Sequence, residues 1–365
     1  MQDRYREFGA ALDAIKKREL AKVSAEDVRY ITRLNRFSRA MEVAGRALIH
    51  FSPEPASFSL GVFALFVHKQ LQAAEVGHSA LHGCYDKFPE AERFHSKRFR
   101  WDAPIEEEGW RLGHNVKHHG NTNIAGKDPD IHFGLARLTP HVPHKFQHWL
   151  QLPFMLFVLA PNFAMLMNMH FTGLYDAYFD NGMPQPDVLP DRSRASVRHA
   201  WKRALGKWAP YYAKNYVFFP ALAGPMFWKV LLGNWLAETT RDLYTAATIF
   251  YGHAGAEVQS YPLGTTSKSK GHWYAMQVES SNNYEVPWVL SVLCGGLDRQ
   301  IEHHLFPTLP PQRIRAIAPE VRALCEEHGV QYKTGSWPRV LGRALAHVAR
   351  LSRRAGAWAV LREAA

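Results

Sequence analysis

The sequence predicts an all-α integral membrane protein, in which about four transmembrane helices form two hairpins beneath a polar helical cap. Two observations lead to this fold class. Five apolar stretches occur, and long polar segments rich in histidine and charge separate the first two, the third and the last two. Hydrophobic residues make up 47% of the 365 residues, yet the mean hydropathy is only −0.28. A few membrane spans under a large polar cap would reconcile these two values.

Residues 1–35 are predicted to form cytosolic helices. The stretch MQDRYREFGAALDAIKKREL is charged, has a helical pattern and lacks the apolar core of a signal peptide. Ser24, with Asp27 three residues later, is typical of a helix start. A partner-binding arm and a merely solvated helical arm both fit this pattern.

The first predicted hairpin joins the apolar stretches 40–51 and 57–71 through the SPEP turn at 52–55. Neither stretch reaches the roughly 20 apolar residues that an isolated span needs. We expect the second helix of this hairpin to extend beyond the bilayer and to carry His78 and His82.

The second predicted hairpin joins 215–232 to 234–251 at Gly233 and Asn234. The basic stretch 180–214 before it is predicted to be a cytosolic loop, because Lys and Arg accumulate on the cytosolic side of membranes.

The remaining apolar stretch, 150–171, contains Pro153, Pro161 and Asn162, so we assign it to an interfacial or half-buried helix. The polar residues from 84 to 148 are expected outside the membrane.

Residues 311–365 are predicted to form cytosolic helices, one over 311–330 and a basic amphipathic one over 336–365. On the second helix, apolar side chains gather on one side and arginines occupy much of the rest. Such a helix suits an anionic membrane surface, and packing back on the cap is equally compatible with the pattern. The apolar residues are Val340, Leu341, Leu345, Val348 and Leu351.

The net charge of +11 is compatible with nucleic acid, anionic lipid or an acidic substrate as a partner. No nucleic-acid motif accompanies the charge, so we favour lipid head groups and phosphates and expect no nucleic-acid partner. Cys84, Cys294 and Cys325 form no CxxC pair, which argues against disulfides, iron–sulfur clusters and thiolate zinc.

Three histidine clusters lie at the edges of hydrophobic segments, in HSALH, HNVKHH and IEHHLF. Residues four apart share a helix face, so His78 and His82 can point at one spot, and so can His114 and His118. Neutral imidazole suits zinc, copper, nickel and iron. The number of histidines excludes a lone structural zinc, which closes at four ligands.

Adjacent histidines add a second feature. His118 and His119 lie about 100° apart on a helix, so they can serve two neighbouring metals. The pair His303 and His304 repeats this arrangement. The three clusters together therefore predict one polynuclear metal site.

An isolated histidine beside an apolar run is usually a core or interface residue, and some clustering among 20 histidines is expected by chance. We therefore treat the scattered histidines as ordinary structural residues. They are His50, His68, His95, His132, His141, His144, His170, His199, His272, His328 and His347.

The motifs HSALHG, GHNVKHHGNTN with GKDPDI, and GGLDRQIEHHLFP resemble those of the membrane fatty acid desaturases over roughly residues 40–310. The glutamine that opens the third box is most similar to that of front-end acyl desaturases and their bacterial relatives. Asp298 stands where many front-end relatives have asparagine, which leaves the subclass and regioselectivity open.

The resemblance implies a di-iron centre held by histidines, and the boxed histidines carry over position by position. It also implies a further ligand after the last span, for which His253 in IFYGHAG is the natural candidate. The implied metal ligands are His78, His82, His114, His118, His119, His253, His303 and His304.

Several polar residues could orient these imidazoles or lie near the metals. Asp128 and Asp130 could equally cap a turn around Pro129, and the two asparagines could be capping residues of a loop. The candidates are Gln300, Asp128, Asp130, Asn282, Asn283 and Asp298.

The reaction implied by the resemblance is O₂-dependent formation of a double bond in a long-chain fatty acyl group, carried as acyl-CoA, acyl-ACP or membrane lipid. An alkyl C–H bond offers no polarity for acid–base chemistry, so the oxidant must come from cofactors, two Fe²⁺ ions and O₂. The chain carries no HPGG haem motif and no flavin or nicotinamide fingerprint. We therefore expect a separate electron donor, a ferredoxin or a cytochrome with its reductase.

Two alternatives remain open. A fatty acid hydroxylase or a decarboxylase that forms terminal alkenes uses similar histidine boxes, and a non-enzymatic membrane metal-binding protein would also need the histidines. In each case we expect cytosolic N-terminal helices over 1–35, a membrane and di-iron domain over 36–310, and C-terminal helices over 311–365. The active site would lie on the cytosolic face of a bacterial inner membrane.

Overall fold

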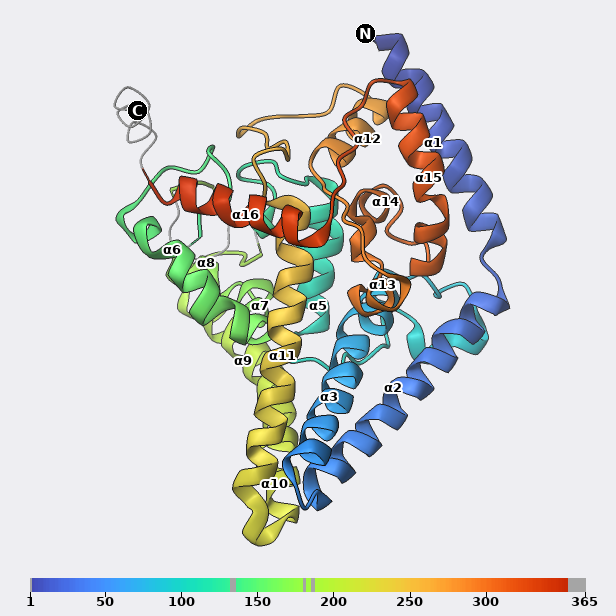
Figure 1. The fold of residues 1–365 in the computed structure, drawn as a ribbon. Coiled ribbons are helices and arrows are strands. Elements are labelled where there is room, and N and C mark those ends of the chain that lie inside the picture. Colours follow the sequence, from blue (N-terminus) through green and yellow to red (C-terminus); the bar gives the residue numbers. More distant parts are fainter. Residues whose placement is uncertain (1, 132–135, 180–181, 185–187, 354–365) are drawn as a thin grey trace.

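The computed structural model describes residues 2–131, 136–179, 182–184 and 188–353. Among these residues all regular structure is helical, apart from two isolated β-bridges. Figure 1 shows a cap of helices from which α2 (Ala25–Phe51), α3 (Pro55–Leu71), α10 (Phe219–Leu222) and α11 (Phe227–His253) extend as a stalk. The all-α prediction is therefore confirmed for the described residues.

The N-terminal region consists of α1 (Gln2–Lys22) and α2 (Ala25–Phe51). The predicted helix start forms, since the Asp27 carboxylate accepts a hydrogen bond of 2.8 Å from the Ser24 backbone N–H and the Ser24 hydroxyl accepts one from Glu26. α2 runs through residue 35 without a break. The domain boundary predicted there thus falls inside a helix.

The first predicted hairpin is present as α2 and α3 (Pro55–Leu71). Glu54 caps α3 by accepting a hydrogen bond from the Ser57 backbone N–H at 2.8 Å. A Cβ atom added to Gly45 would lie 2.7 Å from the Leu65 backbone nitrogen. The close approach of the two helices therefore requires glycine at this position.

The second hairpin turns earlier than predicted. α9 (Arg194–Tyr212) continues through a π-helical turn (η8, Ala213–Phe218) and α10 (Phe219–Leu222) to a turn at Gly224, whose φ is 52° (η9, Gly224–Met226). α11 (Phe227–His253) then returns as one helix through Gly233 and Asn234.

The prediction of a turn at Gly233 and Asn234 is wrong because both residues serve a helix contact. The Asn234 side chain is buried and donates a hydrogen bond of 2.6 Å to the Asn215 backbone oxygen. A Cβ atom on Gly233 would lie 2.7 Å from the Ile49 side chain. Turn-forming residue types thus provide close packing between α2, η8 and α11.

The cytosolic loop predicted over 180–214 is also wrong, because most of it is α9. Ser193 caps this helix by accepting a hydrogen bond from Ser196 N–H at 3.2 Å. Ala200 and Ala204 are buried against Leu174 and Leu189. The many basic residues of this stretch led to the loop prediction, although α9 has a buried apolar face.

One stretch in the described part of the chain, Phe146–Phe171, is long and apolar enough to cross a membrane, judged by length and composition. The sequence assigned it to the interface, and 33% of its most apolar window is buried. It is built from η5 (Phe146–Leu150), α6 (Gln151–Phe154), η6 (Met155–Leu159), η7 (Ala160–Asn162) and α7 (Phe163–Phe171).

The four predicted spans do not satisfy the same criterion. α3 has only 17 residues, and α11 includes the charged residues Lys229, Glu238, Arg241 and Asp242. The number of four crossings therefore stays a prediction.

The cap places α1 beside α12 (Lys270–Glu279) and α15 (Pro311–Glu327), with α14 (Gln300–Leu305) against them. Phe8, Leu12, Ile314 and Val321 are buried in their shared core. The helix predicted over 311–330 is confirmed as α15.

The C-terminal amphipathic helix is α16 (Trp337–Leu351), which lies across the cap end of α11 and beside α6 (Figure 1). Val340, Val348 and Leu351 are buried, whereas Leu341 and Leu345 are half-buried. The helix thus packs back on the cap, and its predicted continuation from Arg354 onward lies outside the described residues.

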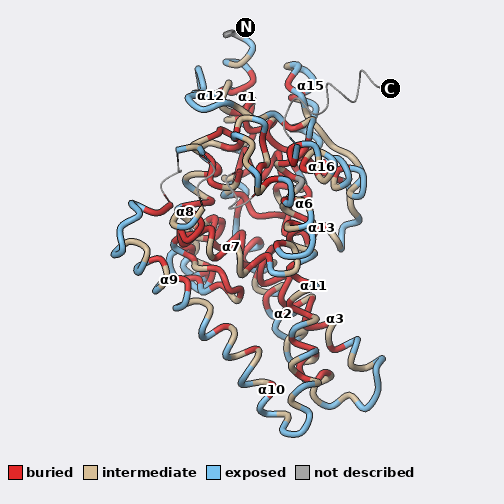
Figure 2. The backbone as a smooth tube through the Cα atoms, turned by 90° about the vertical axis from the view of Figure 1, so that its left-hand side faces the viewer, coloured by how far each residue is buried: buried red, intermediate tan, exposed pale blue. Residues whose placement is uncertain are grey.

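Short helices complete the chain. They are η1 (Gln72–His78), α4 (Ser79–Leu81), η2 (Pro89–Phe94), α5 (Glu107–Trp110), η3 (Arg111–His118), η4 (Pro129–Ile131), α8 (Leu174–Tyr178), α13 (Trp288–Cys294) and η10 (Leu297–Arg299). The tube in Figure 2 is mostly buried in the cap and carries many exposed residues along the stalk.

Candidate metal centre

The first histidine pair stands where α3 continues into the cap through the π-helical turn η1 and then α4. The Nε2 atoms of His78 and His82 lie 3.2 Å apart. Trp101 Nε1 donates a hydrogen bond to the Gln72 backbone oxygen at 2.9 Å, and a Cβ atom on Gly77 would lie 2.1 Å from this nitrogen. Because residue 77 is glycine, the Trp101 indole can approach the turn closely and stabilise the backbone that carries His78 and His82.

The second box differs from the expected α-helix, because it forms the π-helical turn η3. A π-helix brings residues five apart together. Accordingly, His114 Nε2 lies 3.3 Å from His119 Nε2, whereas the His114 and His118 rings stack with their centroids 5.1 Å apart. The π-turn thus brings His119 beside His114. The expected approach of His114 to His118 is also present, since these two histidines and Asp130 form a further group whose ligand atoms lie within 4.8 Å of one another.

The third box follows a tight reversal between α13 and α14. Gly295 and Gly296 have φ values of 71° and 77°, a region that favours glycine. A Cβ atom on Gly295 would lie 2.8 Å from Ala74, so the reversal fits closely against η1. It aims the adjacent residues His303 and His304 into the cap.

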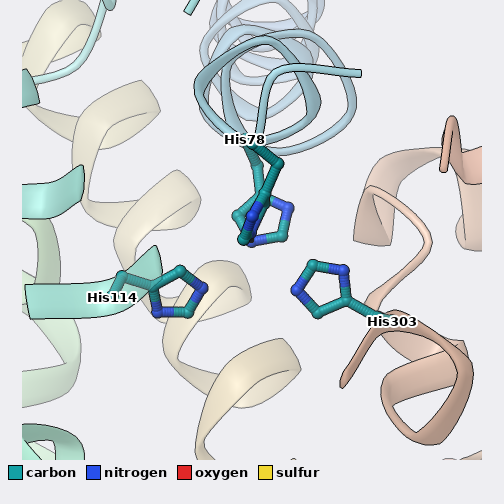
Figure 3. A group of neighbouring side chains, drawn as sticks. His78, His114 and His303 are labelled. Carbon is teal, nitrogen blue, oxygen red and sulfur yellow. Dashed lines mark hydrogen bonds between the residues drawn. The ribbon is translucent and has the colours of Figure 1, made fainter. Parts of the chain in front are cut away.

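The histidines gather in two groups whose nitrogens could each hold a metal ion. His78, His82, His114 and His303 form the first group, and His118, His253 and His304 form the second. Figure 3 shows His78, His114 and His303 pointing toward one another from different elements. The adjacent residues His303 and His304 thus divide, since His303 lies in the first group and His304 in the second.

His119 lies between the two groups. Its ring centroid is 4.8 Å from that of His303 and 4.3 Å from that of His304. All eight sequence-predicted ligands therefore converge within the cap, His253 among them.

Hydrogen bonds orient the second group. His118 Nδ1 lies 2.9 Å from the Asp128 carboxylate, and His253 Nδ1 lies 3.0 Å from the Ser280 backbone oxygen. His304 Nδ1 lies 3.1 Å from Gln277 Oε1. Each ring thus directs its other nitrogen, Nε2, inward.

Asp128 and Asp130 both contact the candidate ligands. Asp128 is fully buried and also accepts hydrogen bonds from the Asn123 and Asp130 backbone N–H groups, so the orienting role and the turn-capping role coexist. Asp130 approaches His114 Nδ1 at 3.4 Å.

His170 is part of the same network, although the sequence treated it as an ordinary core histidine. His170 belongs to α7, far along the chain from the histidine boxes. Its Nε2 atom lies 3.0 Å from Asp130 Oδ1. His170 is buried, as expected of a core histidine, and it contacts the carboxylate network as well. Gln277 was likewise missed, and neither residue belongs to a motif that could have indicated it.

Gln300 lies inside the second group. Its Nε2 atom is 2.7 Å from His253 Nε2 and 3.3 Å from His304 Nε2, while its Oε1 atom is buried and has no hydrogen-bond partner. Rotating the amide would direct Oε1 toward the two imidazoles, where it would suit a cation.

The other candidates form their described hydrogen bonds away from the histidine rings. The Asn282 amide donates to Glu257, and the Asn283 amide donates to Glu302 at 2.8 Å. Asp298 accepts from the Ser291 hydroxyl at 2.8 Å. These contacts stabilise the loops around α13 and α14.

The pKa shifts of His303 and His118 have opposite signs. Burial, with neighbouring His78 and His114, lowers the pKa of His303 well below its usual range, so this imidazole is neutral as metal binding requires. Burial opposes the charge on His118 too, but Asp128 and Asp130 outweigh it and raise the pKa of His118 to about 9. The carboxylates thus favour a positive charge here, which a metal cation would also supply.

Apolar cavities adjoin both groups. One is lined by His78, His114, Trp110 and Phe171, among others. Another borders the second group.

The sequence model of one protein family, described as fatty acid desaturase, matches residues 53–336, which include all eight candidate ligands. The chain belongs to the fatty acid desaturase family. It is therefore an oxidoreductase, and the predicted family and class of enzyme are confirmed.

Relatives within the fatty acid desaturase family carry specific names. An NADPH-dependent stearoyl-CoA 9-desaturase of Mycobacterium tuberculosis is 30% identical, over 94% of this chain and 79% of its own. An sn-1 linoleoyl-lipid 6-desaturase of Synechocystis is 26% identical, over 75% of this chain and 74% of its own. An acyl-lipid 8-desaturase of Rebecca salina is 29% identical, over 63% of this chain and 47% of its own. Fatty acyl chains are the common substrate in these names.

Proposed function

We propose that the eight histidines hold two iron ions and that the chain uses O₂ to introduce a double bond into a long fatty acyl chain. The observation that carries this proposal is the convergence of two imidazole groups beside apolar cavities. The donor set fits a metal pair. Several ε nitrogens face one another at about hydrogen-bond distance, and His303 Nε2 and His119 Nδ1 are buried without a partner.

The chemistry supplied by two bound irons is activation of O₂ to an oxidant that can break unactivated C–H bonds. Overall, one acyl chain loses two hydrogen atoms and gains a double bond. O₂ takes up these hydrogens with two electrons and two protons and leaves as two water molecules.

The protein residues position the reactants. The apolar walls, with Trp110 and Phe171 next to His114, hold the acyl chain and exclude water from the centre. Asp128, Gln277 and the Ser280 carbonyl fix the ring orientations of the second group. Gln300 is placed to offer its amide oxygen to a metal in that group.

The electron donor is proposed to be a separate protein, a ferredoxin or a cytochrome with its reductase. The acyl carrier is acyl-CoA, acyl-ACP or lipid.

Membrane insertion is proposed for the stalk and the apolar helices, with the metal centre on the cytosolic face of a bacterial inner membrane. It is supported by large apolar side chains exposed along the stalk. These include Phe51, Phe63, Phe218, Leu222 and Trp228.

The test is mass-spectrometric profiling of fatty acids and volatile hydrocarbons from cells that express the chain, beside a His303→Ala control. A new double bond that depends on His303 is expected. Hydroxylated acids or terminal alkenes would instead assign the related hydroxylase or decarboxylase reaction. Metal in the purified protein without O₂ consumption, when reduced ferredoxin or cytochrome is supplied, would indicate a metal-binding protein without catalysis.

A further inference from the structure

The cavity beside the first histidine group has polar residues as well as apolar walls. His78 contributes to its lining, and so do three polar residues of the stalk helices α3 and α11, namely Gln70, Arg241 and Thr245. On α11, Arg241 precedes His253 by about 18 Å along the helix axis. Because α3 and α11 pack together and both run from the stalk into the cap, the three polar residues lie on the stalk side of the histidines (Figure 1). We call Gln70, Arg241 and Thr245 the polar floor of the cavity.

A buried charge in the stalk is unusual, because the stalk is proposed to enter the membrane. Charged residues within membrane segments are costly and mark functional sites by default. Arg241 is only 1% exposed. Its Nη2 atom donates to Glu238, and its Nε atom lies 2.9 Å from Asp242 Oδ1. Lys69 Nζ lies 2.6 Å from Glu238 Oε2.

These four side chains balance in charge, since two are cations and two are carboxylates. A further anion at the floor would disturb this balance and would have to leave water. A neutral group that forms hydrogen bonds is therefore the ligand that suits the floor.

The hydrogen bonds of the floor are incomplete within the described structure. Arg241 Nη1 is buried and has no hydrogen-bond partner there, an arrangement that is costly for a donor. Thr245 lies one turn further along the same face of α11. Its hydroxyl donates to Gln70 Oε1 at 2.8 Å, and the oxygen of that hydroxyl retains a lone pair that can accept. The floor thus offers a donor and an acceptor side by side.

We infer that the polar floor binds a hydroxyl group, and that the acyl chain taken up by this cavity carries that hydroxyl at the end remote from its carboxyl group. The inference rests on the proposed desaturase function and specifies its substrate class. A hydroxyl can accept a hydrogen bond from Arg241 Nη1 and donate one to Thr245. A methyl end would leave Nη1 unpaired, and sites built to bind a hydroxyl discriminate strongly against analogues that lack it.

Three substitutions on α11 test the floor. Thr245→Val keeps the shape of the side chain and removes its oxygen. Arg241→Lys keeps a positive charge beside Glu238 and Asp242 but removes the planar guanidinium. Thr240→Val is the matched control, because Thr240 is an exposed threonine of the same helix. Unchanged iron content in each variant verifies that the fold is retained.

The binding probe is a long-chain primary alkanol with a diazirine on the carbon next to the hydroxyl carbon, compared with the alkane that carries its diazirine at the same position. Both are added to the full chain in detergent micelles, and labelling after illumination is mapped by mass spectrometry. We expect the alkanol to label the floor about tenfold more than the alkane, because it forms two additional hydrogen bonds.

The variants show whether this preference comes from the floor. Thr245→Val and Arg241→Lys should each lower alkanol labelling about fivefold and leave alkane labelling unchanged, since each removes one hydrogen bond. Thr240→Val should change neither. Equal labelling by the two probes, or alkanol labelling that is the same in all variants, would overturn the inference.

An activity measurement separates this inference from the proposed function. Cells that express the chain receive equal amounts of ¹³C-labelled fatty acids, from lauric to stearic acid, and of the matched ω-hydroxy acids, so that the cell supplies the acyl carrier. We expect one ω-hydroxy acid to gain a double bond about tenfold faster than its parent acid, and Thr245→Val to lower this ratio about fivefold.

The two ideas fail in different ways. Double bonds formed equally in both kinds of acid, in a ratio that Thr245→Val leaves unchanged, would overturn the hydroxyl assignment and leave desaturation standing. Preferential labelling of the floor by the alkanol, without a double bond in any acid, would retain the binding site and contradict the proposed function.

Discussion

The two histidine groups are held in different ways. In the second group, each ring has a hydrogen-bond partner for Nδ1, namely Asp128, the Ser280 carbonyl or Gln277. In the first group, His114 Nδ1 approaches Asp130 at 3.4 Å, whereas the hydrogen bond described for His78 and His82 joins the two rings to one another. Ring contacts dominate there, with His114 stacked on Trp110 at 4.6 Å between centroids.

This difference indicates how much each group depends on metal. Hydrogen bonds fix both the position and the tautomer of the second group before a metal binds. Packing fixes ring positions in the first group but leaves ε nitrogens facing one another. We therefore expect the second group to be preorganised, and the first to need a bound cation to satisfy its nitrogens.

Removing one ligand from each group should have the largest effect. We expect His303→Ala and His304→Ala each to lose one metal ion while the other group keeps its own. Activity should fall by more than about 100-fold, because changing residues behind a ligand alone costs roughly 10- to 100-fold. Iron per chain and double-bond formation measure the two effects. His199→Ala, an exposed residue on α9, is the control, and normal activity in either ligand variant would contradict the assignment.

Asp128→Ala should have the next largest effect, because Asp128 holds His118 and two backbone N–H groups. We expect a loss of about 10- to 100-fold in metal affinity, confined to the second group. Metal titration followed by iron absorption spectra would measure it. Asp13→Ala removes an exposed carboxylate that pairs with Lys270 and should change neither metal. Equal losses of metal affinity in both groups would contradict the proposed difference in how the two groups are held.

Trp110 tests whether packing positions the first group. Trp110→Phe retains an aromatic face for His114, whereas Trp110→Leu removes it. We expect the Leu variant to lose about 1 kcal/mol more of the free energy of unfolding than the Phe variant, and to lower metal occupancy of the first group alone. Thermal unfolding and metal analysis of both variants measure this. The idea fails if Leu and Phe behave alike.

His170 should show the smallest effect. It contacts Asp130, which also contacts His114. We expect His170→Ala to lower desaturation by less than about tenfold with metal content nearly unchanged. His347→Ala on α16 should have no effect. A His170→Ala protein without any activity would show that His170 has a more direct role.

The fold was predictable where the signal was local. The capping box at Ser24 and the helix over 311–330 follow from residue types a few positions apart, and both are present. The turn predicted at Gly233 failed because glycine also permits close helix packing, here against Ile49. Which of the two uses applies depends on a helix far away in the sequence.

The residues of the candidate site were likewise predictable only where the sequence signal is local. Spacing indicated the boxed histidines, because residues four apart or adjacent meet through helix geometry alone. Asn282 and Asn283 were expected near the metals but bond to Glu257 and Glu302. Gln277 and His170 were missed, since single residues carry no spacing signal.

By itself, the sequence determined an all-helical chain, its family and the seven clustered histidines, because periodicity and motif spacing are local properties, and the family resemblance added His253. The tertiary structure decided how those histidines divide. The π-turn pairs His114 with His119, and the reversal at Gly295 sends His303 and His304 to different groups. Side-chain direction depends on backbone geometry and on distant packing partners, so residue spacing alone could not supply it.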